Sequence, residues 1–159
     1  MKMKSKKTYS DRTDIEKLEA NWTKTLGLHQ REEFSMAIIR ATTCAEIAAN
    51  IAIRAELVEK RHLEGKFVDS LMSWANGLKG KFDRLLMPAT EGSDVHAVLR
   101  KHKTEALTLN DKRNKIAHSG QFAVHKTAQE MLLLAHSLCT GIAKAYGKNI
   151  TLKKPIERA

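Results

Sequence analysis

Residues 37–58, which read AIIRATTCAEIAANIAIRAELV, decide the fold of this chain. Apolar side chains occur on nearly every side of a helix built from this stretch. We therefore predict a helix over about 30–62 whose centre is buried almost all round. One polar stripe interrupts it at helical spacing: Arg40, Thr43, Glu46, Asn50 and Arg54. The stripe fits a solvated or interface face as well as it fits a functional face.

The rest of the chain is also predicted to be helical, because apolar residues recur at spacings of three and four and strand-like alternation is absent. Further helices are expected over about 13–26, 66–76, 79–87, 94–118 and 125–146. Gly27 is expected to end the first of them, and residues 88–94 are expected to form a loop. The predicted fold is all-α: an antiparallel bundle of five to six helices. It forms one domain over 11–147, between a basic N-terminal arm (1–10) and a basic C-terminal tail (148–159).

Composition narrows the class of protein further. A formal net charge of +10 on 159 residues favours contact with a polyanion such as RNA or DNA, although part of this charge lies in the two terminal segments. Cys44 and Cys139 fall within apolar helical patterns, so we expect two buried, free thiols in a reducing compartment. The sequence has no run of 18 apolar residues, so no membrane span is expected, and no secretory signal is evident. A cytoplasmic protein with no membrane partner is expected.

Several common catalytic and cofactor motifs are missing from the sequence. No Cys-x-x-Cys or His-Glu-x-x-His spacing indicates a metal site, and His96 and His102 are expected on the surface. The Gly80-Lys81 pair lacks the flanking residues of a Walker-type phosphate loop and is interpreted as a helix boundary. No nucleophile elbow indicates a serine hydrolase. We therefore expect neither a metal nor a cofactor.

The segment 113–118, Arg-Asn-Lys-Ile-Ala-His, carries the remaining chemistry. Arginine can clamp a phosphate through two hydrogen bonds, and histidine can move a proton near neutral pH. Arg113 falls within the apolar stripe of its helix and needs a counter-charge, for which Glu46, with Asn50 as an orienting partner, is the candidate. On an ideal helix Arg113 and His118 lie about 140° apart. The two side chains can contact one ligand only if the helix end is distorted, if the long arginine side chain reaches round the helix, or if a second chain contributes.

A purely structural interpretation of the same residues has equal weight. In that interpretation Arg113 forms a buried ion pair with Glu46, and His118 lies at the negative end of a helix dipole, where histidine is common.

With the following Ser119 and Gly120, this segment resembles the signature of the HEPN superfamily: arginine, a polar residue, three more residues and histidine at the end of a long helix. The resemblance covers about 32–146, where an apolar helix with an embedded acid precedes the motif helix and an apolar helix follows it. It implies an antiparallel helical bundle that forms a homodimer with the two motifs facing each other across a cleft.

The resemblance also implies a function. Many HEPN proteins are metal-independent endoribonucleases, often toxins or phage-defence effectors. Here Arg113, Asn114 and His118 would be catalytic, with Glu46 and Asn50 supporting them. RNA would be the substrate, 2′,3′-cyclic phosphate ends the product, and an antitoxin a further partner. One departure is Gly120: toxins paired with a nucleotidyltransferase antitoxin carry a tyrosine at that position.

Two other functions fit the sequence. The first is a non-catalytic, dimeric HEPN-like module that binds a nucleotide, a nucleic acid or a protein. Mannitol-repressor-type regulators, which carry a related Arg-Asn…Ala-His segment, are an example. The second is a helical protein that binds nucleic acid through charge alone, with a steep dependence on salt.

Overall fold

The computed structural model describes residues 7–156. Within this range the chain forms one short 3-10 turn, η1 (Tyr9–Asp11), six continuous helical stretches and no strand. The all-α prediction is therefore confirmed. Most of the predicted basic arm, residues 1–6, and the last three residues of the predicted tail lie outside the described residues.

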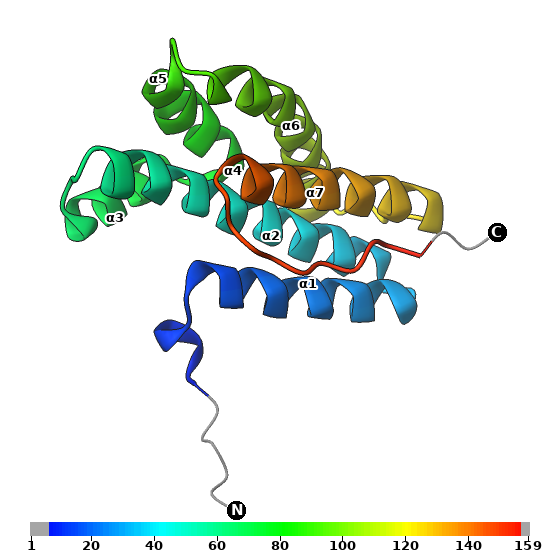
Figure 1. Ribbon diagram of the computed structural model, residues 1–159. Helices are drawn as coiled ribbons and strands as arrows, with labels where there is room; N and C mark the ends of the chain where they lie inside the picture. The colour runs from blue at the N-terminus through cyan, green and yellow to red at the C-terminus, as the bar shows by residue number, and fades with distance from the viewer. Residues whose placement is uncertain (1–6, 157–159) are drawn as a thin grey trace, which may run out of the picture.

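α1 (Asp14–Gln30) and α2 (Phe34–Arg54) form a helical hairpin at one side of the molecule (Figure 1). Thr13 begins α1, because its side-chain oxygen accepts the backbone N–H of Glu16 at 3.2 Å. The prediction that Gly27 ends this helix is wrong. Its neighbours Leu26 and Leu28 both pack against the core. A glycine inside a helix costs only about 1 kcal/mol, so this packing is enough to carry the helix past it.

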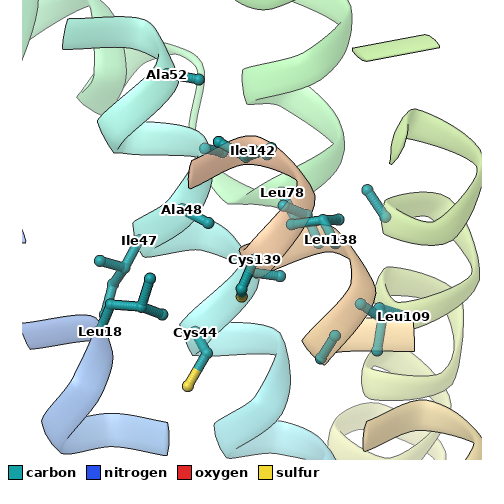
Figure 2. Close-up of a cluster of buried hydrophobic side chains, with 14 of the residues drawn as sticks. Leu18, Cys44, Ile47, Ala48, Ala52, Leu78, Leu109, Leu138, Cys139 and Ile142 are labelled. Atoms are coloured by element: carbon teal, nitrogen blue, oxygen red, sulfur yellow. The ribbon is translucent and has the colours of Figure 1, made fainter. Parts of the chain in front are cut away.

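α2 is the central helix and, as predicted, is buried over most of its circumference. Figure 2 shows Cys44, Ala48 and Ala52 of α2 close to Cys139 and Ile142 of a later helix, α7 (His125–Ala145). The small alanine side chains allow the two helices to approach closely. Both cysteines are free and buried, as the sequence predicted. Burial raises the pKa of Cys44 to about 12, so its thiol is an inert part of the core.

α2 continues into η2 (Ala55–Lys60), a π-helical turn. Within residues 7–156, Phe34–Lys60 is the one helical stretch with the length and mean hydropathy, 1.4, of a membrane span, and 67% of its apolar window is buried inside the bundle. Such burial is typical of a core helix. The location of the protein in the cell remains a prediction.

Two helical stretches follow on one side of the bundle. The first is α3 (Gly65–Trp74), and the second joins α4 (Gly77–Gly80), the π-helical turn η3 (Lys81–Leu86) and α5 (Met87–Thr90) without a break. The expected loop over 88–94 is therefore wrong in its first half, because the helix includes Pro88. The π-turn before Pro88 already shifts the hydrogen-bond ladder, so the missing proline N–H does not end the helix.

α6 (Val95–Ser119) crosses α2 and α7 steeply (Figure 1). Gly120 ends it with a left-handed φ of 64°. α7 runs parallel to α2: the rings of Phe34 and His125 at their first residues lie 5.4 Å apart, and Tyr146 after α7 donates to Glu56 in η2. The expectation of an antiparallel bundle is therefore wrong for this pair of helices. α2 and α7 are far apart in the sequence, so no short loop fixes their relative direction.

Two surface expectations change with this packing. His102 is buried, because Gly141 on α7 leaves room for its ring, while its Nδ1 lies 2.6 Å from Glu105 Oε1. The described part of the C-terminal segment lies along the bundle: the Trp22 indole N–H donates to the carbonyl of Lys153 at 2.8 Å, and Pro155 is buried. Leu152 also packs against the core.

Candidate functional site

The motif lies on a regular helix. α6 keeps its α-helical conformation through Ser119, which removes a distorted helix end as a way to join Arg113 and His118. Asn114 and His118 are one turn apart on the same face, and both are exposed. Arg113 is half-buried and leaves the helix on a different face. Regular helical geometry therefore starts the arginine and histidine side chains about 140° apart.

Arg113 faces Glu46 without binding it directly. Its Nη1 donates to Asn114 Oδ1 at 3.3 Å, and its charge is close enough to lower the pKa of Glu46. Among the described residues, however, Arg113 has no ion pair within 4.0 Å. The buried Arg113–Glu46 ion pair of the structural interpretation is therefore not formed. The guanidinium keeps most of its donors for a ligand.

Lys81 is a charged residue of this region that sequence reasoning missed. It lies at the start of η3, is only 6% exposed, and donates from Nζ to the carbonyl of Met72 at 3.1 Å. A signal for it was present: Lys81 shares a helical stripe with Leu78, Phe82 and Leu85, which are all buried. A lysine at such a core position calls for compensation, which comes from the carbonyl of Met72 and, without a direct ion pair, from the charge of Glu46.

Burial controls the electrostatics of Glu46 and Lys81. Burial raises the pKa of Glu46, and the positive charges of Lys81 and Arg113 oppose the rise without cancelling it. Burial likewise lowers the pKa of Lys81, opposed by Glu46 and assisted by the charge of Arg54. We call Glu46, Asn50, Lys81 and Arg113 the inner cluster. Its two cations against one carboxylate leave it positive when all are charged.

Asn50 belongs to the inner cluster through Lys81. Its Oδ1 is buried and has no hydrogen-bond partner among the described residues, which is an unusual state for a buried acceptor. Asn50 and Lys81 line one surface hollow of about 310 Å³, which Asn76 and Ser73 also line. The sequence placed Asn50 opposite Arg113, whereas the structure places it beside Lys81.

The other members of the α2 polar stripe have structural partners. Arg54 forms ion pairs with Asp14 at 2.8 Å and Asp69 at 2.7 Å. Arg40 donates to Asn21 at 3.1 Å. The two ends of the stripe, Arg40 and Arg54, therefore bind residues of α1 and α3. Its middle residues, Glu46 and Asn50, lie near Lys81.

Asn114 also borders open space. It lines a second hollow, of about 520 Å³, together with Asn110 one turn earlier on α6 and residues of α3, α4 and η3. The two hollows share Asn76. The motif thus has an exposed proton-transfer group, His118, and an amide at a hollow. Its arginine belongs to the positive inner cluster, and such a set suits an anionic ligand.

Metal chemistry has no candidate ligand set here: within residues 7–156, no three His, Cys, Asp or Glu side chains are placed to hold a metal ion. Comparison of the chain with protein-family models, curated proteins and solved structures finds no match.

Proposed function

We propose that this protein is a HEPN-type, metal-independent endoribonuclease that acts as a homodimer. The observation that supports this most directly is the placement of the motif. Asn114 and His118 are exposed on one face at the end of a regular helix, and Arg113 beside them keeps free donors. A ribonuclease of this type needs a group that moves a proton and a group that binds the phosphate, and the motif supplies both.

The proposed reaction uses the RNA itself as the nucleophile. His118 takes the proton of a ribose 2′-hydroxyl, and the 2′-oxygen forms a bond to the adjacent phosphorus. The bond from phosphorus to the 5′-oxygen breaks, and that oxygen takes up a proton from the now protonated His118 or from water. Arg113 stabilises the charge that builds up on the phosphate oxygens. The products are a 2′,3′-cyclic phosphate and a 5′-hydroxyl, and DNA is not cut because it lacks the 2′-hydroxyl.

A second copy of the chain would complete the site. Arg113 and His118 lie on different faces of α6, so we propose that the arginine of one protomer serves the histidine of the other. Exposed apolar side chains near the start of α2 and just after the motif in the chain support this. Phe122, in the loop after α6, is 95% exposed, and Val124 and Met36 are also exposed large apolar residues. Exposed apolar groups of this size often mark an interface.

A non-catalytic binding module is the second candidate. The effect of Arg113 on Glu46 favours it, because an arginine whose charge offsets a partly buried carboxylate serves the fold. A dimer of this kind would bind RNA, a nucleotide or a protein such as an antitoxin without cutting anything.

The test is RNA cleavage by matched histidine variants. Total RNA and, separately, a single-stranded DNA are incubated in EDTA with wild type, His118→Asn and His62→Asn. His62 is a suitable control because it is exposed, and its φ of 57° is one that asparagine tolerates. We expect wild type and His62→Asn to cut RNA to cyclic-phosphate ends, and His118→Asn to be inactive. Wild type that binds RNA without cutting it would overturn the ribonuclease and favour the binding module.

A further inference from the structure

The hollow beside Asn114 has a stacking platform on one side. The indole ring of Trp74, at the end of α3, is 60% exposed, and the guanidinium carbon of Arg84 lies 4.9 Å from its centroid. Arg84 Nη1 also donates to the carbonyl of Trp74 at 3.4 Å, which holds the stack in place. Both side chains line the hollow of about 520 Å³. Unpaired RNA bases stack on aromatic rings and on arginine planes of this kind.

The other tryptophan shows what a structural indole looks like in this protein. Trp22 is 2% exposed, and its N–H is bound to the carbonyl of Lys153. Trp74 has neither burial nor such a partner among the described residues. An indole left this open, with its arginine already held in place, suits a planar ligand.

Amide side chains lie around the same hollow. Asn76, Asn110 and Asn114 all line it. Asn114 accepts a hydrogen bond from Arg113, whereas the side chains of Asn76 and Asn110 form none with another described residue. A primary amide offers both a donor and an acceptor, which is the pattern that reads the edge of a nucleobase.

The charge of the hollow suits an anion. Its one carboxylate, Asp83, is paired with Lys103 at 2.8 Å and has Lys79 at 4.0 Å. Lys79 and Arg84 line the hollow as well. Three cations therefore stand against one carboxylate, and the excess positive charge can take up the phosphate of a nucleotide.

We infer that this hollow is a nucleobase subsite for single-stranded RNA. The inference rests on the proposed function, since it names part of the substrate. Asn114 belongs to both the motif and the hollow, and His118 lies one turn further along the same face, about 6 Å along the helix axis. For a base stacked on Trp74 and Arg84, Asn114 links the hollow to the helix face that carries His118. The subsite directs cleavage to unpaired nucleotides and excludes bases that are stacked in a duplex.

The first test measures binding without cleavage. The chain has two tryptophans, and only Trp74 is exposed, so its fluorescence reports on the hollow. The His118→Asn protein is titrated with each of the four ribonucleoside 5′-monophosphates, with an unpaired RNA oligonucleotide and with the same oligonucleotide in a duplex. We expect saturable quenching by the nucleotides and the unpaired oligonucleotide, little by the duplex, and no quenching in a Trp74→Phe protein.

The second test compares two exposed arginines. Arg84→Ala removes half of the platform, whereas Arg100→Ala changes an exposed arginine of α6 that does not line the hollow. We expect about a tenfold loss of affinity for the unpaired oligonucleotide from Arg84→Ala, and no change from Arg100→Ala.

The outcomes separate this inference from the proposed function. Saturable quenching that depends on Arg84, in a protein whose wild type cuts no RNA, supports the subsite and defeats the ribonuclease. Cleavage that needs His118, without quenching and with Arg84→Ala as active as wild type, overturns the subsite and leaves the ribonuclease standing. Quenching by mononucleotides and not by unpaired RNA overturns the RNA subsite. The subsite is also overturned if no RNA or nucleotide quenches Trp74 and only a protein partner or a second copy of the chain buries it.

Discussion

Arg113 and His118 lie on different faces of α6, because the helix is regular through Ser119 and five residues turn it by about 140°. Arg113 is half-buried and close enough to Glu46 to lower the pKa of that carboxyl, whereas His118 is exposed. The regular helix therefore does not by itself present the two groups of the motif to one phosphate. This separation is the reason for proposing a site shared between two protomers.

A shared site predicts complementation between inactive variants. Arg113→Ala and His118→Ala should each be inactive alone. When the two proteins are unfolded, mixed and refolded together, half of the dimers are mixed, and each mixed dimer has one intact site. Mixing should therefore restore about a quarter of wild-type RNA cleavage. No recovery, with mixed dimers confirmed by mass spectrometry, would place the arginine and histidine of each site in the same chain.

The dimer itself predicts an effect of Phe122. Replacing this exposed side chain with serine should leave the monomer fold intact, because Phe122 is 95% exposed there, and should weaken self-association. Sedimentation of wild type and Phe122→Ser over a range of concentrations measures this. Phe67→Ser, which changes an exposed phenylalanine on α3, is the control and should associate like wild type. Equal association of all three proteins would remove Phe122 from the interface.

Glu46→Gln should make the protein as stable as wild type or more stable at pH 7. Burial raises the pKa of Glu46 more than Lys81 and Arg113 lower it, so the ionised carboxylate opposes folding. This cost is present above the raised folded pKa and disappears as the pH falls towards the ordinary value of 4.5, where wild type also becomes neutral. Urea unfolding at pH 4 and pH 7 checks this. A large loss of stability at pH 7 would make Glu46 the essential buried partner of the two cations.

The sequence was sufficient for the helices and the core but not for their relative directions. Apolar spacing located every long helix, and the composition of 37–58 identified α2 as the centre. Helix ends were less certain where packing outweighs local signals, as at Gly27 and Pro88. The parallel packing of α2 and α7 depends on contacts such as Tyr146 with Glu56, between residues 90 positions apart, which no local pattern encodes.

The candidate site was only partly accessible from the sequence. The motif and Glu46 could be found because a charged residue in an apolar stripe is conspicuous. Lys81 satisfies the same criterion, but its position next to Gly80 suggested a helix boundary. The Trp74–Arg84 stack escaped notice because the π-helical turn η3 changes which residues face α3, and regular helical spacing does not predict such a turn.

Tyr146→Phe should destabilise the protein by about 1 kcal/mol at pH 7, the usual value of one buried hydrogen bond. The Tyr146 hydroxyl donates to Glu56 Oε1 at 2.8 Å, and Lys60 and Arg61 bind the same carboxylate. Burial alone would raise the pKa of Glu56, but these hydrogen bonds together lower it. The stability from this carboxylate is therefore complete above pH 4.5 and is lost as the pH falls through the lowered folded pKa.

The measurement for Tyr146→Phe is urea unfolding at pH 7 and pH 3. The difference from wild type should shrink as the pH falls through the lowered pKa of Glu56 and the carboxylate takes up a proton. Tyr9→Phe is the control: the Tyr9 ring is 49% exposed, and the Asn21 amide that donates to its hydroxyl at 3.0 Å also donates to the carbonyl of Lys17, so less than about 0.5 kcal/mol should be lost. Equal effects of the two substitutions would mean that Glu56 does not depend on Tyr146.

Gly141→Ala should destabilise the protein by about 1–3 kcal/mol, the usual cost of overpacking. An added Cβ at this position would lie 2.2 Å from Nε2 and 2.4 Å from Cε1 of His102. The ring cannot move aside easily, because its Nδ1 lies 2.6 Å from Glu105 Oε1 and the side chain is buried. Gly27→Ala is the matched control: its Cβ would meet only the flexible end of Arg31, at 3.4 Å, so this change should stabilise α1 by about 0.5–1 kcal/mol. Thermal unfolding of both variants decides the matter, since a Gly141→Ala protein as stable as wild type would show that α6 and α7 are not packed against each other at His102.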